Sequence, residues 1–112
     1  MGILVADEHK FTHCGLTLSN FVATINGSFL LAKRYIDIEG VTTAIYSIDT
    51  MVHYYASLEA YNNRNNPESR VEPCIRLSYS FDIDASQITS DLYGLFYSKL
   101  VQACNFTNVS NC

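Results

Sequence analysis

The sequence contains no tryptophan and little positive charge. Only 7 of its 112 residues are Lys or Arg, against 11 Asp and Glu, so the formal net charge is −4. Lys33 and Arg34 form the only adjacent basic pair. A nucleic-acid-binding surface needs clustered basic residues to neutralise phosphates, and an anionic membrane surface makes a similar demand. We therefore expect neither nucleic acid nor a membrane among the partners.

Long hydrophobic runs are also missing. No stretch approaches the roughly 20 apolar residues that a membrane-spanning helix requires. The opening MGILVADEHK lacks the basic start and the apolar length of a secretory signal peptide. We therefore expect synthesis in a cytoplasm, which would keep the cysteines reduced. They are Cys14, Cys74, Cys104 and Cys112.

Signatures of catalysis are absent as well. The sequence has no G-x-S-x-G nucleophile elbow, no glycine-rich phosphate loop and no C-x-x-C pair. Ser47, Asp49 and His53 share one face of a predicted strand and resemble a triad only in residue type. At about 3.3 Å per residue, Asp49 and His53 lie about 13 Å apart, far beyond hydrogen-bond reach. We therefore predict no catalytic residues and no enzymatic activity.

Metal-ligand patterns are incomplete. Asp82, Asp84 and Asp91 could hold a hard cation, but the calcium-loop pattern of spaced ligands around a central glycine is missing. Their position between a predicted strand and a predicted helix favours a structural role, because acidic side chains suit a helix N-terminus. A possible zinc group lacks a fourth ligand at suitable spacing; it consists of His9, His13 and Cys14. We therefore predict no metal and no cofactor.

Tyrosine and phenylalanine, by contrast, are plentiful, with 8 and 6 residues, and this favours a β-sheet. The alternating segment 20–25 predicts a first strand. The Asn-Gly pair at 26–27 predicts a hairpin turn, because a type I′ turn needs positive φ at both central residues. The segment 28–39 predicts the return strand, and Gly40 predicts a second turn.

Two further strands are predicted over 41–56 and 71–83. In the first, apolar side chains lie on one face, interrupted only by Thr50; they are Ala44, Tyr46, Ile48, Val52 and Tyr54. The second alternates regularly, which predicts one face on the core and one in water. Pro73 cannot donate to a ladder, so we expect it at an edge or before pairing begins.

After residue 85 the apolar period becomes helical, with Ser86 or Ser90 as the possible N-cap. The spacing comes from Ile88, Leu92, Leu95, Phe96, Leu100 and Ala103. With Tyr93, Tyr97 and Val101 included, the apolar arc spans roughly 240°, whereas one contact face needs about 100°. We therefore expect the helix to be covered on two sides.

Together these segments predict an α+β fold: a four-stranded antiparallel β-meander with one C-terminal α-helix packed on its apolar face. We expect a single domain over 1–112. Its parts would be an irregular N-terminal arm (1–19), the meander (20–83), the helix (86–104) and a tail (105–112).

Aromatic side chains off the predicted core form a candidate protein interface. Tyr and Met are enriched at interfaces, whereas most charged residues are depleted there. The connection 57–70 is too long for a tight hairpin, so we expect it to project and to reach a neighbour. The candidate interface comprises Met51, His53, Tyr55, Tyr61, Asn63, Tyr93 and Tyr97. A better-filled core, or scattered exposed aromatics, is the alternative.

Four segments resemble a group of small proteins from tailed bacteriophages. They are GLTLSNFVATI, YYASLEAYNN followed by NP, LSYSFDID and LYGLFYSKLVQACNFTNVSNC, and the resemblance spans roughly residues 12–112. It implies a non-enzymatic structural protein located in the virion and associated with the tail, neck or fibre. Its partners would be other virion proteins and copies of itself.

Two alternatives remain open at this point. A capsid decoration (cement) protein would share the virion location and the oligomeric contacts. A small cytoplasmic regulator that binds one host protein through its Tyr-rich face would belong to another functional class.

Overall fold

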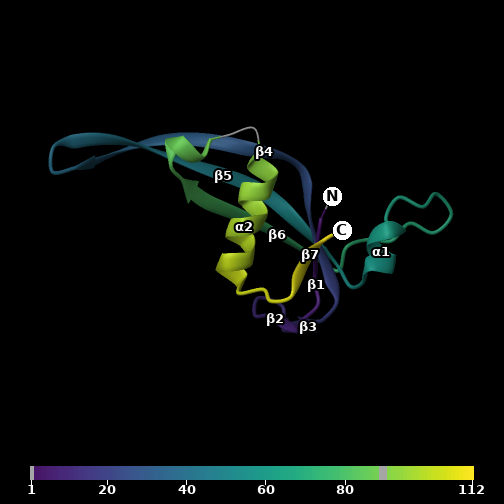
Figure 1. Ribbon diagram of the computed structural model, residues 1–112. Coiled ribbons are helices and arrows are strands. Elements are labelled where there is room, and N and C mark those ends of the chain that lie inside the picture. Colours follow the sequence, from purple (N-terminus) through teal and green to yellow (C-terminus); the bar gives the residue numbers. More distant parts are fainter. Residues whose placement is uncertain (1, 89–90) are drawn as a thin grey trace.

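A computed structural model describes residues 2–88 and 91–112 (Figure 1). The fold is α+β, as predicted, with a five-stranded sheet in the order β6-β5-β4-β1-β7, a separate β2-β3 hairpin and two α-helices. The elements are β1 (Ile3–Val5), β2 (His9–Phe11), β3 (Leu16–Leu18), β4 (Phe21–Ile38), β5 (Val41–Tyr55), α1 (Leu58–Asn62), β6 (Ile75–Ile83), a 3₁₀ turn (Ala85–Gln87), α2 (Leu92–Cys104) and β7 (Val109–Asn111). The four-stranded meander is wrong, because only β4, β5 and β6 follow one another in that way.

The predicted turn at 26–27 is replaced by a bulge inside one long strand. The pairing of β4 with β5 jumps from Asn26↔Met51 to Leu30↔Asp49, and the strand then continues to Ile38. Gly27 has φ +85, which a bulge uses as readily as a hairpin turn does. The two predicted strands 20–25 and 28–39 are therefore one strand, and both halves pair with β5.

The other turn is confirmed. The last meander strand is confirmed from Ile75 onward, but residues 71–74 of the predicted strand 71–83 lie outside β6. Glu39 and Gly40 both have positive φ, 51° and 81°, as a type I′ turn between β4 and β5 requires. Along β6, side chains alternate between buried or half-buried and exposed positions. Pro73 precedes Ile75, the first residue of β6 that pairs with β5, so its missing N–H leaves the ladder intact.

The predicted irregular arm and tail contain strands instead. β1 pairs with β4 through Ile3↔Ala23, and β7 pairs with β1 through Ile3↔Asn111. Gly2 and Cys112 exchange two backbone hydrogen bonds of 3.4 and 3.0 Å, so the ends of the chain lie side by side. Strands of three residues are too short to show a period of two, and this is why the sequence did not predict them.

Helix α2 begins later than the predicted residue 86. Its N-cap is Asp91, whose carboxylate accepts the Gly94 N–H at 2.9 Å. Ser86 lies in the 3₁₀ turn, while Ser90, the other predicted cap, lies outside the described residues. The predicted end at Cys104 is confirmed, and Asn105 closes the helix in the left-handed conformation with φ 55.

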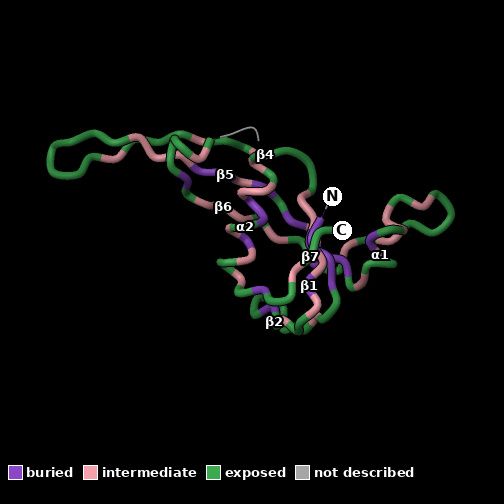
Figure 2. The backbone as a smooth tube through the Cα atoms, viewed as in Figure 1, coloured by how far each residue is buried: buried purple, intermediate pink, exposed green. Residues whose placement is uncertain are grey.

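The core lies between α2 and one face of the sheet, with the β2-β3 hairpin closing one end (Figure 2). Phe21 is fully buried, and its ring centroid lies 5.6 Å from that of Phe11 and 5.5 Å from that of Phe106. The predicted cover on a second side of α2 is not found among the described residues. Tyr93 is 45% exposed, and Tyr97 packs in the same core as the rest of the helix.

A phenol pair links two strands of the core. The hydroxyl groups of Tyr54 and Tyr79 lie 2.6 Å apart. Burial, together with the hydrogen bond to Tyr79, raises the pKa of Tyr54. Burial likewise raises the pKa of Tyr79 from 10.0 to about 12. Both phenols are therefore held neutral in the folded chain.

Alkaline pH is expected to destabilise the protein through this pair. Below pH 10 both phenols are neutral in the folded and unfolded chains; as pH rises from 10 towards about 12, the unfolded chain releases protons that the folded chain retains. The free energy of unfolding should therefore fall across this window. Urea denaturation at successive pH values checks it, and a Tyr54→Phe/Tyr79→Phe variant should show a shallower fall. An identical slope in both proteins would contradict the expectation.

Removing the central ring of the core should be strongly destabilising. Phe21→Ala is expected to lower the free energy of unfolding by about 3–5 kcal/mol, because it deletes a fully buried aromatic side chain and leaves a cavity. Leu58→Ala is the control: Leu58 is 39% exposed, so about 1 kcal/mol or less is expected. Chemical denaturation of both variants measures the difference, and equal losses would place the core elsewhere.

Candidate protein interface

The structure places Tyr97, predicted off the core, inside it. Tyr97 is 6% exposed, and its hydroxyl oxygen accepts the backbone N–H of Ile25 at 3.0 Å. This bond joins α2 to β4 just before the bulge. Within the isolated chain Tyr97 therefore positions the helix on the sheet.

Tyr55 and Tyr61 lie on the opposite face of the sheet, where α1 covers them. Tyr55 points away from the main core, as predicted, but is only 6% exposed, because Tyr61 packs against it with ring centroids 5.8 Å apart. Val22 completes this second, smaller apolar cluster. Helix α1, at the start of the long connection, thus covers part of the second sheet face.

Polar groups secure both ends of α1. Ser57 is the N-cap, and its hydroxyl oxygen accepts the Ala60 N–H at 3.1 Å. Asn63 follows the last turn and donates its side-chain amide to the Glu59 carbonyl at 2.9 Å. Arg64 lies 3.9 Å from the centroid of the Tyr61 ring and donates to the Tyr61 carbonyl at 2.7 Å. Asn63 therefore has a structural role inside the chain.

Four of the predicted interface residues stay at least partly accessible. Met51 is 39% exposed, Tyr93 is 45% exposed, and His53 and Asn63 are half-buried. Burial, with Arg76 nearby, lowers the pKa of His53 from 6.5, so the imidazole is neutral at pH 7. The interface role of all seven residues stays a prediction.

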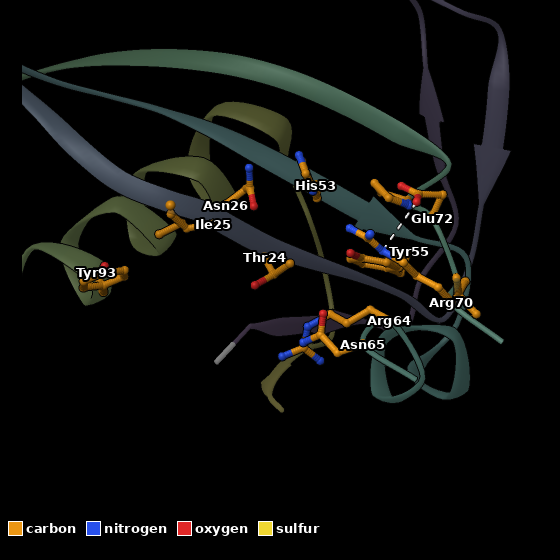
Figure 3. Close-up of a pocket in the computed structure, with 13 residues that line it drawn as sticks. Thr24, Ile25, Asn26, His53, Tyr55, Arg64, Asn65, Arg70, Glu72 and Tyr93 are labelled. Carbon is orange, nitrogen blue, oxygen red and sulfur yellow. Dashed lines mark ion pairs between the residues drawn. The ribbon is translucent and has the colours of Figure 1, made fainter. Parts of the chain in front are cut away.

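A polar hollow of about 360 Å³ lies between the second sheet face and the chain that follows α1 (Figure 3). Thr24, Asn26 and His53 line it from the sheet, and Arg64 lines it from the connection. Glu72 is held by two arginines, with Arg70 at 3.6 Å and Arg76 at 3.1 Å. These exposed ion pairs contribute little to stability. The hollow therefore offers polar contacts rather than an apolar ligand pocket.

The three carboxylates considered as cation ligands have structural partners. Asp82 forms an exposed ion pair with Arg34 at 3.4 Å. Asp84 belongs to the capping box of the 3₁₀ turn, and Asp91 caps α2, so the predicted structural roles are confirmed for these two. Within residues 2–88 and 91–112, no group of three or more His, Cys, Asp and Glu side chains is placed to hold a metal ion. All four cysteine thiols are free.

The most distinctive surface is one that the sequence did not single out. β6 pairs with β5 only as far as Tyr46↔Ile83, and β1 pairs with β4 only over Phe21–Ala23. Beyond these points β4 and β5 continue as a projecting two-stranded ribbon (Figure 1). We name residues 34–45 the β-arm; Figure 2 shows it to be largely exposed.

Large apolar side chains lie exposed on the β-arm and at its base. The exposed fractions are 65% for Leu30, 43% for Leu31, 65% for Tyr35, 58% for Ile38 and 63% for Val41. Near the base, the Lys33 ammonium lies 5.2 Å from the centroid of the Tyr35 ring and 5.6 Å from that of Tyr46. Asp37 accepts the Thr42 hydroxyl at 2.6 Å. The β-arm therefore combines exposed apolar area with ordered charged groups.

Comparisons of the chain with protein-family models, with curated proteins and with solved structures find no match. The resemblance to phage virion proteins therefore stays a prediction. In the described part of the chain, no helix is both long and apolar enough to cross a membrane.

Removing the Tyr97 hydroxyl should destabilise the chain itself. Tyr97→Phe is expected to lower the free energy of unfolding by about 1–3 kcal/mol, because the Ile25 N–H loses a part-buried acceptor. Tyr93→Phe is the matched control, since the exposed Tyr93 keeps its ring contact with Phe29. Thermal and urea denaturation measure both. Unchanged stability of Tyr97→Phe, with loss of assembly, would assign the hydroxyl to an interface instead.

Proposed function

We propose that this chain is a non-enzymatic structural subunit of a tailed-phage virion that acts through protein–protein contacts. The observation that carries the proposal is the β-arm, which extends the described chain to 57 × 28 × 23 Å. A tail, neck or fibre location follows from the resemblance of the four sequence segments named above.

The physics of a two-stranded ribbon supports a role in assembly. An isolated hairpin is at best marginally stable in water, because no third layer buries its side chains. Exposed apolar side chains on a domain surface mark contact sites when they gather in one place. The β-arm presents Ile38 and Val41 together, because they pair with each other at its tip. A surface built in this way becomes stable when another protein covers it.

The polar hollow gives less support to an enzymatic function than to a binding function. The candidate triad stays spread along β5, where Asp49 lies opposite Ser80 and His53 lies opposite Arg76. His53 therefore has no positioned nucleophile from this set. The lining residues suit hydrogen bonds with a partner surface.

Incorporation into virions should depend on the apolar end of the β-arm. An Ile38→Ser/Val41→Ser variant is expected to be lost from purified particles, because it removes the side chains that a neighbour would bury. Its melting temperature should change little, since both side chains are already exposed. Leu58→Ser is the matched control, as an exposed leucine outside the β-arm. Mass spectrometry of particles grown with each variant measures incorporation.

Purified virions also distinguish the proposed role from the two alternatives, a decoration protein and a cytoplasmic regulator. Absence of the wild-type chain from purified virions would overturn the proposal and favour the cytoplasmic regulator. Immunogold labelling over the capsid surface would favour a decoration protein, whereas labelling at the tail or neck would support the proposed location.

A further inference from the structure

The outer edge of β4 is open along the β-arm. On the side away from β5, β1 pairs with β4 over Phe21–Ala23 only, and the Ile25 N–H donates to the Tyr97 hydroxyl. From Leu30 to Ile38, none of the described strands pairs with this edge. An unpaired edge presents a row of N–H and C=O groups, which is a template for another strand.

Charge along this edge is arranged with opposite signs at its two ends. Between Ser28 and Ile45 the only charged residues are, in order, Lys33, Arg34, Asp37 and Glu39. In an antiparallel pair of two identical strands, the basic half of one strand faces the acidic half of the other. Such an edge is therefore complementary to itself.

Symmetry restricts the possible registers. Consider two copies related by a two-fold axis perpendicular to the sheet. Each residue then lies opposite a residue whose side chain is on the same face, so the two sequence numbers are both odd or both even. The axis therefore passes beside one residue, on which the register is centred. Centring on Tyr35 sets Lys33 opposite Asp37 of the second copy, twice, with the two Tyr35 rings between them. Centring on Arg34 would set two arginines opposite each other, which is destabilising.

The register centred on Tyr35 also suits both faces of the ribbon. Lys33, Tyr35 and Asp37 lie on one face, opposite Tyr46, Ala44 and Thr42 of β5. On the other face, Ala32 would lie opposite Ile38 of the second copy, where apolar side chains meet, and Arg34 would lie opposite Ile36, which the apolar stem of the arginine can cover. A register centred on Ile36 would instead use Glu39, which belongs to the turn.

We propose that two copies of this chain pair antiparallel through the β4 edges of their β-arms, centred on Tyr35, with reciprocal Lys33–Asp37 contacts. The pairing joins two β4–β5 ribbons into a four-stranded sheet and gives each arm a neighbour along its open edge. It rests on the proposed structural role of the chain, yet it is tested without virions.

Charge reversal tests the pairing in the full-length purified chain. Sedimentation of the wild-type protein over a concentration series should show a dimer. Lys33→Glu alone and Asp37→Lys alone should each weaken dimerisation roughly tenfold or more, because each sets like charges opposite one another. Mixing the two variants should restore a heterodimer, since both contacts are then attractive. That recovery also shows that each variant is folded.

Matched controls define the face and the register. Arg34→Glu makes the same charge change on the other face of the ribbon and should leave the dimer intact; the ion pair it loses with Asp82 is exposed. Glu39→Lys should also have little effect. Loss of the dimer with Glu39→Lys but not with Asp37→Lys would overturn the register.

Separate results bear on the two proposals. A wild-type chain that stays monomeric at all concentrations, or single variants that dimerise as well as the wild type, would overturn the pairing even if the chain is found in virions. A dimer that responds to charge as expected, in a chain absent from virions, would keep the pairing and refute the virion role.

Discussion

The antiparallel ladder between β4 and β5 is the interaction on which the other elements depend. At one end, Phe21 and Tyr54 supply its core-facing side chains, and β1, β6 and α2 gather around them. At the other end, along the β-arm, the same two strands continue, and none of the described strands pairs with them there. One ladder, interrupted by the bulge after Asn26, thus belongs both to a packed core and to a projecting arm, which makes the shape of the molecule strongly asymmetric.

The bulge after Asn26 lies within the body of the sheet, before the β-arm begins at Arg34. Gly27 relaxes the register there, and Phe29 then contacts Phe96 and Tyr93 of α2 with ring centroids 5.5 and 4.7 Å apart. On the other side of the bulge, the Ile25 N–H is bound by Tyr97. Helix α2 therefore contacts β4 both before the bulge and within it. These contacts in the body of the sheet set the direction of the β-arm.

Charge on the β-arm and at its base serves two purposes at once. Lysine on a strand edge discourages indiscriminate pairing, because it cannot be placed against another cation or a dry apolar surface. Lys33 is ordered over two tyrosine rings, and Asp37 is ordered by Thr42. Charges held in place in this way permit only a complementary edge to bind, so the exposed apolar residues act within a restricted set of registers.

Local patterns by themselves determined the alternation of β6, the turn at Gly40 and the C-terminal end of α2, because each rests on periodicity or on one residue's backbone preference. Only the tertiary structure decided that Asn26-Gly27 is a bulge, that β1 and β7 join the sheet, and that Tyr55 and Tyr97 are covered. It also decided that β4 and β5 extend beyond β1 and β6 to form the β-arm. The strands that pair with a given strand, and the residues that bury a given side chain, come from segments far away in the chain. Local sequence patterns therefore do not predict them.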